Sequence, residues 1–254
     1  MPYANNAGVR IHYEVEGIGP PLVLQHGFTI SIESWRTYGY VDALRTQYRL
    51  IPIDARGHGR SDKPHEEASY ALDQRVADVT SVLDALGVER AHFWGYSMGG
   101  WIGFGMAKFA PHRVNGLVIG GQDPYGKERG GVMSDWIKDG IAHGPDALVA
   151  GLEKIVGQPL SEHWKQGLHQ ADLEAWLVMA EQPRPNLESM LGTLRMPCCL
   201  YAGEADSPFE QMKAASKQIP NACFFSLPGL NHIQALYESS KVLPRVMEFL
   251  AAHR

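Results

Sequence analysis

The spacing of hydrophobic residues along the chain changes between the period of a strand and the period of a helix. From Val9 to Val15 apolar and polar residues alternate, which predicts a half-buried strand. Between Tyr70 and Gly87 apolar residues recur at helical spacing, and Gly87 ends that predicted helix. Other runs are apolar on consecutive positions, as in strands that helices cover on both faces of a parallel sheet: 22–25, 48–53, 91–94 and 114–120.

This alternation of strands and helices stops after the run at 114–120 and resumes later in the chain. Residues 123–193 are helical and irregular in pattern and contain no strand-like run. Strands and helices are then predicted again, at 196–203, 210–218, 222–227 and 233–252. We therefore predict an α/β core formed by residues 1–122 and 194–254, with a helical cap of residues 123–193 inserted after its sixth strand. The tryptophans of this cap are expected mainly to pack it onto the core, and some to line a pocket.

The stretch Gly95-Tyr96-Ser97-Met98-Gly99 carries the clearest chemical signal in the chain. It is a G-x-S-x-G pattern between an apolar run and a helix-like segment rich in small residues. A serine hydroxyl is a poor nucleophile unless a base takes its proton and the backbone exposes it. A sharp turn from strand to helix exposes the serine, and the crowded backbone of this turn needs glycine on both sides.

Three further segments lie where this motif requires partners. His26-Gly27-Phe28 follows an apolar strand and can supply a backbone N–H to a developing oxyanion. Asp206 follows the strand-like run 198–202, and His232 follows another at 223–225. The order Ser, Asp, His along the chain is the order of the α/β-hydrolases.

With these residues the chain resembles the α/β-hydrolase superfamily, in the branch of small esterases, lactonases and cofactor-free haloperoxidase-like enzymes. The segment 54–62 is also similar to the D-x-R-G-x-G-x-S-D loop of that family, and 110–114 to the link that follows the elbow helix. The resemblance extends over nearly the whole chain. It implies a mostly parallel eight-stranded sheet with helices on both faces and an inserted helical cap.

The resemblance also implies a role for each candidate residue. Ser97 is the expected nucleophile, His232 the base that takes its proton, and Asp206 the carboxylate that orients the imidazole. The backbone N–H groups of Phe28 and Met98 are the expected oxyanion hole. Two other carboxylates stay open as the acid: Asp123, after the strand that follows the elbow, and Glu204. His26 and His58 are expected to be hydrogen-bonded scaffold residues.

Composition excludes several other functions. The net charge is −5 and no dense cluster of lysine or arginine occurs, which argues against nucleic-acid and anionic-membrane partners. No metal-ligand spacing and no nucleotide-binding glycine motif is present, so we predict neither a metal nor a cofactor. The first eight residues lack the pattern of a signal peptide, so the expected location is cytoplasmic. Oligomeric state is not readable from the pattern.

The chain has three cysteines, Cys198, Cys199 and Cys223. Neighbouring residues on a strand point to opposite faces, so Cys198 and Cys199 are not expected to pair with each other. All three are predicted to be buried, reduced thiols on two neighbouring strands, which fits a reducing compartment.

The expected activity is hydrolysis of a small or medium carboxylic ester or lactone through an acyl-enzyme on Ser97. Serine at the elbow disfavours the dehalogenase and epoxide hydrolase relatives, which use aspartate there. Hydrolysis of a carbon–carbon bond in a vinylogous diketone stays open, although the 26–31 loop lacks the further glycines and proline usual for those enzymes. A ligand-binding receptor of the same fold, with slow or no turnover, is the alternative outside catalysis. The expected partner in every case is a small molecule.

Overall fold

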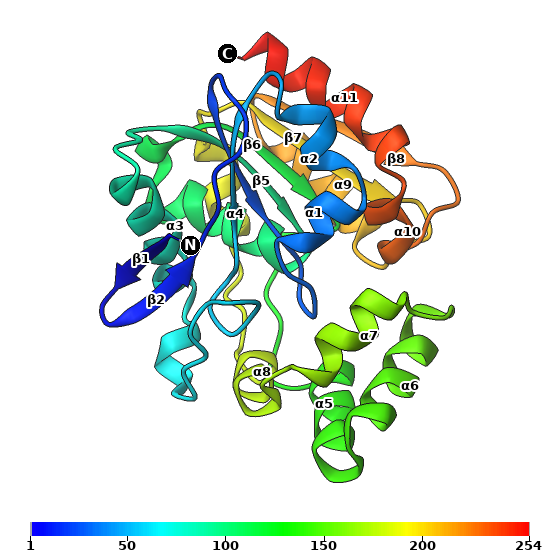
Figure 1. The fold of residues 1–254 in the computed structure, drawn as a ribbon. Helices are drawn as coiled ribbons and strands as arrows, with labels where there is room; N and C mark the ends of the chain where they lie inside the picture. Colours follow the sequence, from blue (N-terminus) through cyan, green and yellow to red (C-terminus); the bar gives the residue numbers. More distant parts are fainter. Residues whose placement is uncertain (1, 254) are drawn as a thin grey trace.

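The protein is built around a parallel sheet with helices on both faces, as Figure 1 shows. The computed structural model describes residues 2–253. In spatial order the main sheet contains β4 (Arg49–Ile53), β3 (Pro21–Gln25), β5 (Ala91–Tyr96), β6 (Val114–Gly120), β7 (Cys198–Gly203) and β8 (Ala222–Leu227). All neighbouring strands in it run parallel. The predicted α/β fold with a mostly parallel sheet is therefore confirmed.

The strands are divided between two sheets, which corrects the prediction of a single eight-stranded one. β1 (Tyr3–Asn6) and β2 (Val9–His12) form a separate antiparallel pair. The residues after β2 reach β4 only through isolated bridges, from Tyr13 to Ile53 and from Glu16 to Leu50. The N–H of Glu14 donates to the carbonyl of Pro52, but Pro52 has no N–H to donate in return. The ladder is therefore interrupted at that residue, and pairing resumes where the N–H of Asp54 donates to the carbonyl of His12.

Side chains that alternate along the strands form two hydrophobic clusters, one on each face of the sheet. One face is covered by α3 (Leu72–Ala85), α4 (Met98–Phe109) and α9 (Phe209–Gln218). The other face is covered by α1 (Glu33–Thr37), α2 (Tyr40–Leu44), α10 (His232–Tyr237) and α11 (Ser239–Ala252). The predicted helix at 233–252 is thus two helices, because the backbone leaves the helical region at Glu238.

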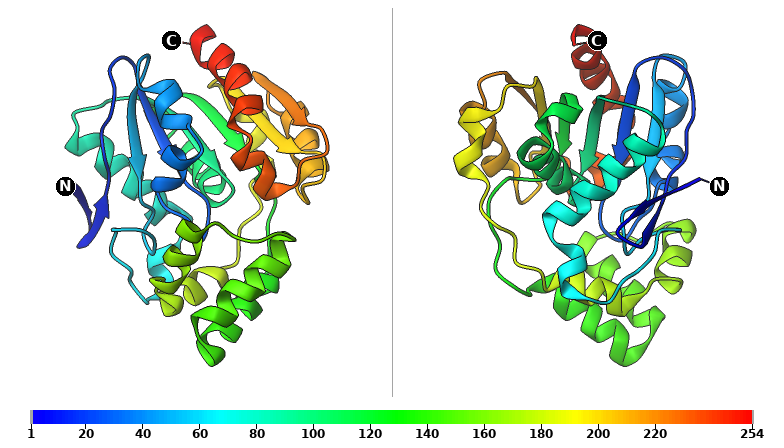
Figure 2. Two further views of the ribbon diagram at one scale, coloured as in Figure 1. Left: turned by 45° about the vertical axis from the view of Figure 1, so that its right-hand side comes forward. Right: turned by 90° about the vertical axis from the view of Figure 1, so that its left-hand side faces the viewer.

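Between β6 and β7 the chain forms a group of helices beyond one end of the sheet (Figure 2). These are α5 (Val132–His143), α6 (Pro145–Val156), α7 (Glu162–His169) and α8 (Leu173–Ala180), followed by the 3-10 turn η3 (Glu188–Thr193). Their tryptophans, Trp136, Trp164 and Trp176, belong to the same buried cluster as α3 and α4, so they pack the insertion onto the core as predicted.

The division into a core and a cap of residues 123–193 stays a prediction, and its outer limits, Met1 and Arg254, lie outside the described residues. Both ends of the segment come together in a backbone bridge between Lys127 and Arg184. Across residues 2–253, no helix is both long enough and apolar enough to cross a bilayer.

Candidate active site

Ser97 lies at a sharp turn between β5 and α4. Its φ of 52° and ψ of −117° place its backbone in a region that favours glycine. A Cβ atom at Gly95 would lie 2.1 Å from the carbonyl oxygen of Gly99, and one at Gly99 would lie 2.0 Å from that of Gln25. Neither position has room for a side chain. The glycines of the motif are therefore required by the close packing of the backbone around Ser97.

His232 is brought to Ser97 by the loop that follows β8. It is the first residue of α10, whose N-cap Asn231 forms a capping box with Gln234. The Nε2 atom of His232 lies 3.0 Å from Ser97 Oγ. The hydroxyl of Tyr96 donates a hydrogen bond to the carbonyl of His232, which ties this loop to the strand before Ser97.

Asp206 completes a continuous polar chain. Its Oδ2 atom lies 2.8 Å from Nδ1 of His232. The carboxylate is almost fully buried, whereas the imidazole side chain is 35% exposed. When His232 is neutral, these contacts fit the tautomer that donates from Nδ1 to Asp206 and accepts the Ser97 hydroxyl proton at Nε2.

The other two candidate acids take no part in this chain. Asp123 accepts a hydrogen bond from the N–H of Tyr125, two residues further on, and so closes its own turn. Glu204 accepts one from the hydroxyl of Ser226 at the exposed edge of the sheet. Of the three carboxylates that the sequence left open, only Asp206 contacts the imidazole.

The two predicted oxyanion-hole amides lie on either side of Ser97. Met98 is the first residue of α4, where backbone N–H groups have no partner within the helix. Phe28 follows Gly27, at which a Cβ atom would lie 3.4 Å from the Cβ of Ser97. Within the part of the chain that the structure describes, neither N–H donates to another protein group. Both amides are therefore available to an oxygen bound beside Ser97.

Comparison with known proteins agrees with this geometry. The family model described as "alpha/beta hydrolase fold" matches residues 20–135, which include the loop after β3, the elbow and α4. An enol-lactonase from Burkholderia xenovorans LB400 has the same fold, with a TM-score of 0.84 over 98% of this chain and 100% of its own, at 22% identity. Together these matches support assigning the chain to the α/β-hydrolase superfamily.

Two curated relatives differ in how much of this chain they match. "Putative 2-succinyl-6-hydroxy-2,4-cyclohexadiene-1-carboxylate synthase" of Bacillus subtilis (strain 168) is 28% identical over 96% of both chains. "Putative carbamate hydrolase RutD" of Azorhizobium caulinodans is 36% identical over 47% of this chain and 43% of its own. Together with the family match, the relative named as a carbamate hydrolase supports a hydrolase activity.

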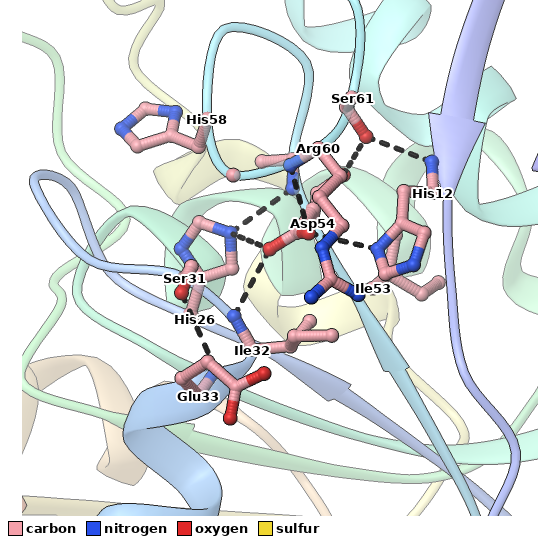
Figure 3. A network of polar contacts seen from close by, with 12 residues as sticks. His12, His26, Ser31, Ile32, Glu33, Ile53, Asp54, His58, Arg60 and Ser61 are labelled. Atoms are coloured by element: carbon pink, nitrogen blue, oxygen red, sulfur yellow. Dashed lines mark hydrogen bonds and ion pairs between the residues drawn. The ribbon is translucent and has the colours of Figure 1, made fainter. Parts of the chain in front are cut away.

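A second group of polar residues supports the loops around the candidate active site (Figure 3). Asp54, directly after β4, accepts hydrogen bonds from the backbone N–H groups of Ile32 and Arg60 and from His12 Nδ1. Burial alone would raise the pKa of Asp54, but these hydrogen bonds and the nearby His26 hold it below its usual value. Asp54 thus joins two loops of the core to strand β2.

His26 and His58 are buried scaffold residues, as predicted. His26 donates from Nδ1 to the carbonyl of Gly27 and accepts the N–H of Ala55 at Nε2. His58 accepts the N–H of Thr29 and stacks on Trp176 of α8. Burial lowers the pKa of both imidazoles, and for His58 the nearby His26 lowers it further. Both therefore remain neutral and hold the loop that carries Phe28.

A cavity of about 300 Å³ lies between the core loops and the helices α7 and α8. Thr29, Ile30, His58, Trp164 and Trp176 are among its lining residues, and Ser97 is not. The loop after β3 connects the two places, because Gly27 lies beside Ser97 while Thr29 and Ile30 face the cavity. Two of the insertion's tryptophans therefore line a pocket as well as pack the core.

Sequence reasoning missed one charged residue close to the triad. Arg184 donates to the side chain of Gln122 at 3.0 Å and lies over the ring of Trp101. Burial lowers its pKa. Gln122 follows Gly121, at which a Cβ atom would lie 3.0 Å from Cε1 of His232. Arg184 thus stabilises, through Gln122, the segment that lies beside the imidazole of His232. Arg184 stands alone between two prolines, and no sequence motif there predicts this role.

Proposed function

We propose that this protein hydrolyses a small or medium carboxylic ester or lactone through an acyl-enzyme on Ser97. The Oγ atom of Ser97 attacks the carbonyl carbon while His232 Nε2 takes the hydroxyl proton. The bond to the leaving oxygen then breaks, and His232 returns the proton to that oxygen. Water, deprotonated by the same imidazole, attacks the acyl carbon and releases the acid.

The observation that carries this proposal is the unbroken chain from Ser97 Oγ to His232 Nε2 and from His232 Nδ1 to Asp206, at 3.0 and 2.8 Å. Both distances are within hydrogen-bond reach before any substrate binds. The buried carboxylate stabilises the imidazolium that forms when the serine proton is transferred. The three side chains already have the spacing that the first proton transfer needs.

The N–H groups of Phe28 and Met98 are proposed to stabilise the tetrahedral intermediate. The carbonyl oxygen becomes an oxyanion when Ser97 attacks, and these two amides are the proposed donors to that charge. One such donor contributes about 3 kcal/mol to the transition state. The position of Met98 at the N-terminus of α4 adds the favourable field of the helix.

Residues 123–193 are proposed to act as a cap that selects the substrate. The cavity under α7 and α8 has a volume of about 300 Å³, at the small end for ligand sites. Its size favours small or medium substrates. The relative named as a putative carbamate hydrolase supports hydrolysis as the reaction type here.

The proposal is tested by labelling and hydrolysis. We expect a fluorophosphonate to label the wild-type protein at Ser97, and the Ser97→Ala variant to remain unlabelled. Ser216→Ala is the matched control, because Ser216 lies on α9 and donates only to the carbonyl of Lys213. Hydrolysis is then measured on a panel of esters, lactones, amides and a vinylogous diketone. Equal rates for wild type and Ser97→Ala on every compound would overturn the mechanism.

A receptor function predicts a different result from the same experiment. A binding protein of this fold does not need a nucleophile, so absence of labelling and of turnover with short p-nitrophenyl esters would favour it. Rapid turnover of the diketone alone, abolished in Ser97→Ala, would favour carbon–carbon bond hydrolysis. The relative from Bacillus subtilis is named as a synthase, which is a reason to include non-ester compounds.

A further inference from the structure

Two cysteines face each other across neighbouring strands, away from the active site. Cys199 on β7 and Cys223 on β8 are direct partners in the parallel register. Their side chains therefore lie on the same face of the sheet. The distance between neighbouring strands, about 4.8 Å, is within the range of Cα separations that a disulfide can bridge. Cys198 precedes Cys199 and faces the opposite side.

The two thiols differ in exposure. Cys199 is 1% exposed and belongs to the cluster under α11, whereas Cys223 is exposed. The prediction that all three thiols are buried is thus wrong for Cys223. The reason is that β8 is the edge strand of the sheet, so no further strand covers that side. A dissolved oxidant can reach Cys223 and cannot reach Cys199 directly.

The contact between the thiols activates the exposed one. A hydrogen bond from the Cys199 thiol to the Cys223 sulfur lowers the pKa of Cys223 to about 7 and raises that of Cys199. Partial burial opposes the effect on Cys223. From α11, Arg245 favours the thiolate and Glu248 disfavours it. A thiolate is the reactive form toward oxidants, so an appreciable fraction of Cys223 is reactive at neutral pH.

We propose that Cys199 and Cys223 form a redox-active pair that hydrogen peroxide converts into a disulfide between β7 and β8. In the first step the Cys223 thiolate attacks one peroxide oxygen. An S–O bond forms, the O–O bond breaks, and the leaving hydroxide takes a proton to become water. In the second step the Cys199 sulfur attacks the sulfenic sulfur of Cys223. The S–S bond forms, the S–O bond breaks, and hydroxide leaves with the Cys199 proton as a second water.

This disulfide would join the two strands that carry partners of Ser97. β7 leads to Asp206 and β8 leads to His232. Both cysteines lie at the second residue of their strands, at the opposite end from those loops. The cross-link would secure the edge strand and protect Cys223 from further oxidation. This inference stands on the two strands alone and does not depend on the proposed hydrolase activity.

The test is peroxide treatment of the full-length protein followed by intact mass measurement. We expect the wild-type protein to lose two hydrogen atoms, with no gain of oxygen and no dimer. Cys199→Ser is expected to gain one or more oxygens at Cys223 instead, since no second thiol resolves the sulfenic acid. Cys198→Ser is the matched control, because it removes the neighbouring thiol on the opposite face and should behave as wild type.

Three results would overturn the proposal. The first is that wild type and Cys199→Ser gain oxygen at the same rate. The second is that Cys198→Ser fails to form the disulfide. The third is that the wild type forms a disulfide between molecules. A second measurement, the rate of iodoacetamide labelling against pH, should have its midpoint near 7 for Cys223 and move upward in Cys199→Ala, which removes the hydrogen-bond donor.

Discussion

The molecule contains two sets of serine, histidine and aspartate, and they do different things. In the active site His232 Nδ1 lies 2.8 Å from Asp206. In the loops around β4, His12 Nδ1 lies 2.9 Å from Asp54, and Ser61 is adjacent (Figure 3). The carboxylate–imidazole contacts are almost identical. The presence of such a pair therefore does not by itself indicate catalysis.

The difference lies on the far side of each imidazole. Nε2 of His232 meets the hydroxyl of Ser97, whereas Nε2 of His12 has no hydrogen-bond partner among the described residues. The Ser61 hydroxyl donates to the carbonyl of Asp54 and accepts the N–H of His12, so it is held by the backbone. His12 is also fully buried, while His232 is 35% exposed. Only the first set is open to a substrate.

The largest effect is expected for Asp206→Asn. The NH2 group of asparagine can donate to Nδ1, which favours the wrong tautomer of His232, and the uncharged amide does not stabilise the imidazolium. We therefore expect kcat to fall by about 10⁴-fold. The stability of the fold should change little, because the loop keeps its backbone contacts. Initial rates and urea unfolding on the same preparation provide the measurement. A kcat within tenfold of wild type would remove Asp206 from the mechanism.

Asp54→Asn should lower the stability of the fold much more than it lowers kcat. The carboxylate of Asp54 accepts hydrogen bonds from Ile32, Arg60 and His12. In the asparagine variant an NH2 group replaces one of the carboxylate oxygens, and this hydrogen-bond donor would face other donors. We expect a loss of about 3 kcal/mol in the free energy of unfolding, because a buried, hydrogen-bonded charge is removed. The kcat of the folded protein should fall far less than in Asp206→Asn. Unchanged stability would show that this network is dispensable.

Acid should destabilise the scaffold through His26 and His58. Burial lowers the pKa of both, so below about pH 6.5 the unfolded chain binds protons that the folded one does not. Stability is fully present above that pH and falls as pH decreases, by about 1.4 kcal/mol per pH unit for each group. The effect of Asp54, whose pKa is also lowered, begins only below pH 3.8.

Urea unfolding at pH 7.5 and 5.5 measures this dependence. His58→Asn should reduce the slope, because the side chain no longer titrates. His112→Asn serves as the control, since His112 is exposed and outside both networks. Equal slopes in wild type and His58→Asn would contradict the assignment of His58 as a buried neutral group.

The smallest effect concerns the backbone at the two serines. Ser97 has a positive φ, and Ser61 does not. The Ser97→Gly variant should therefore be more stable than Ser97→Ala, by about 1 kcal/mol in the free energy of unfolding. This difference already includes the larger loss of backbone entropy that glycine undergoes on folding. At position 61 the order should reverse. Thermal unfolding of the four variants measures both differences, and the same order at both sites would contradict backbone strain at the elbow.

Much of the fold was predictable because its signals are local. Consecutive apolar positions predicted the buried strands, and the glycines of residues 95–99 predicted a turn in which no side chain fits. The separate β1–β2 sheet was not predicted. It depends on Pro52, whose missing N–H matters only when that residue faces the chain after β2. Pairing between distant strands has no local period to reveal it.

The same limit applies to the polar residues. The sequence alone identified Ser97, Asp206 and His232 as candidates, because each follows a strand in a recognisable setting. It left three acids open and offered no sign that His12, Asp54 and Ser61 meet. Only the tertiary structure decided which carboxylate faces which imidazole and which thiol is exposed at the sheet edge. Residue type determines what a group can do, whereas distance, burial and the partner on its far side determine what it does.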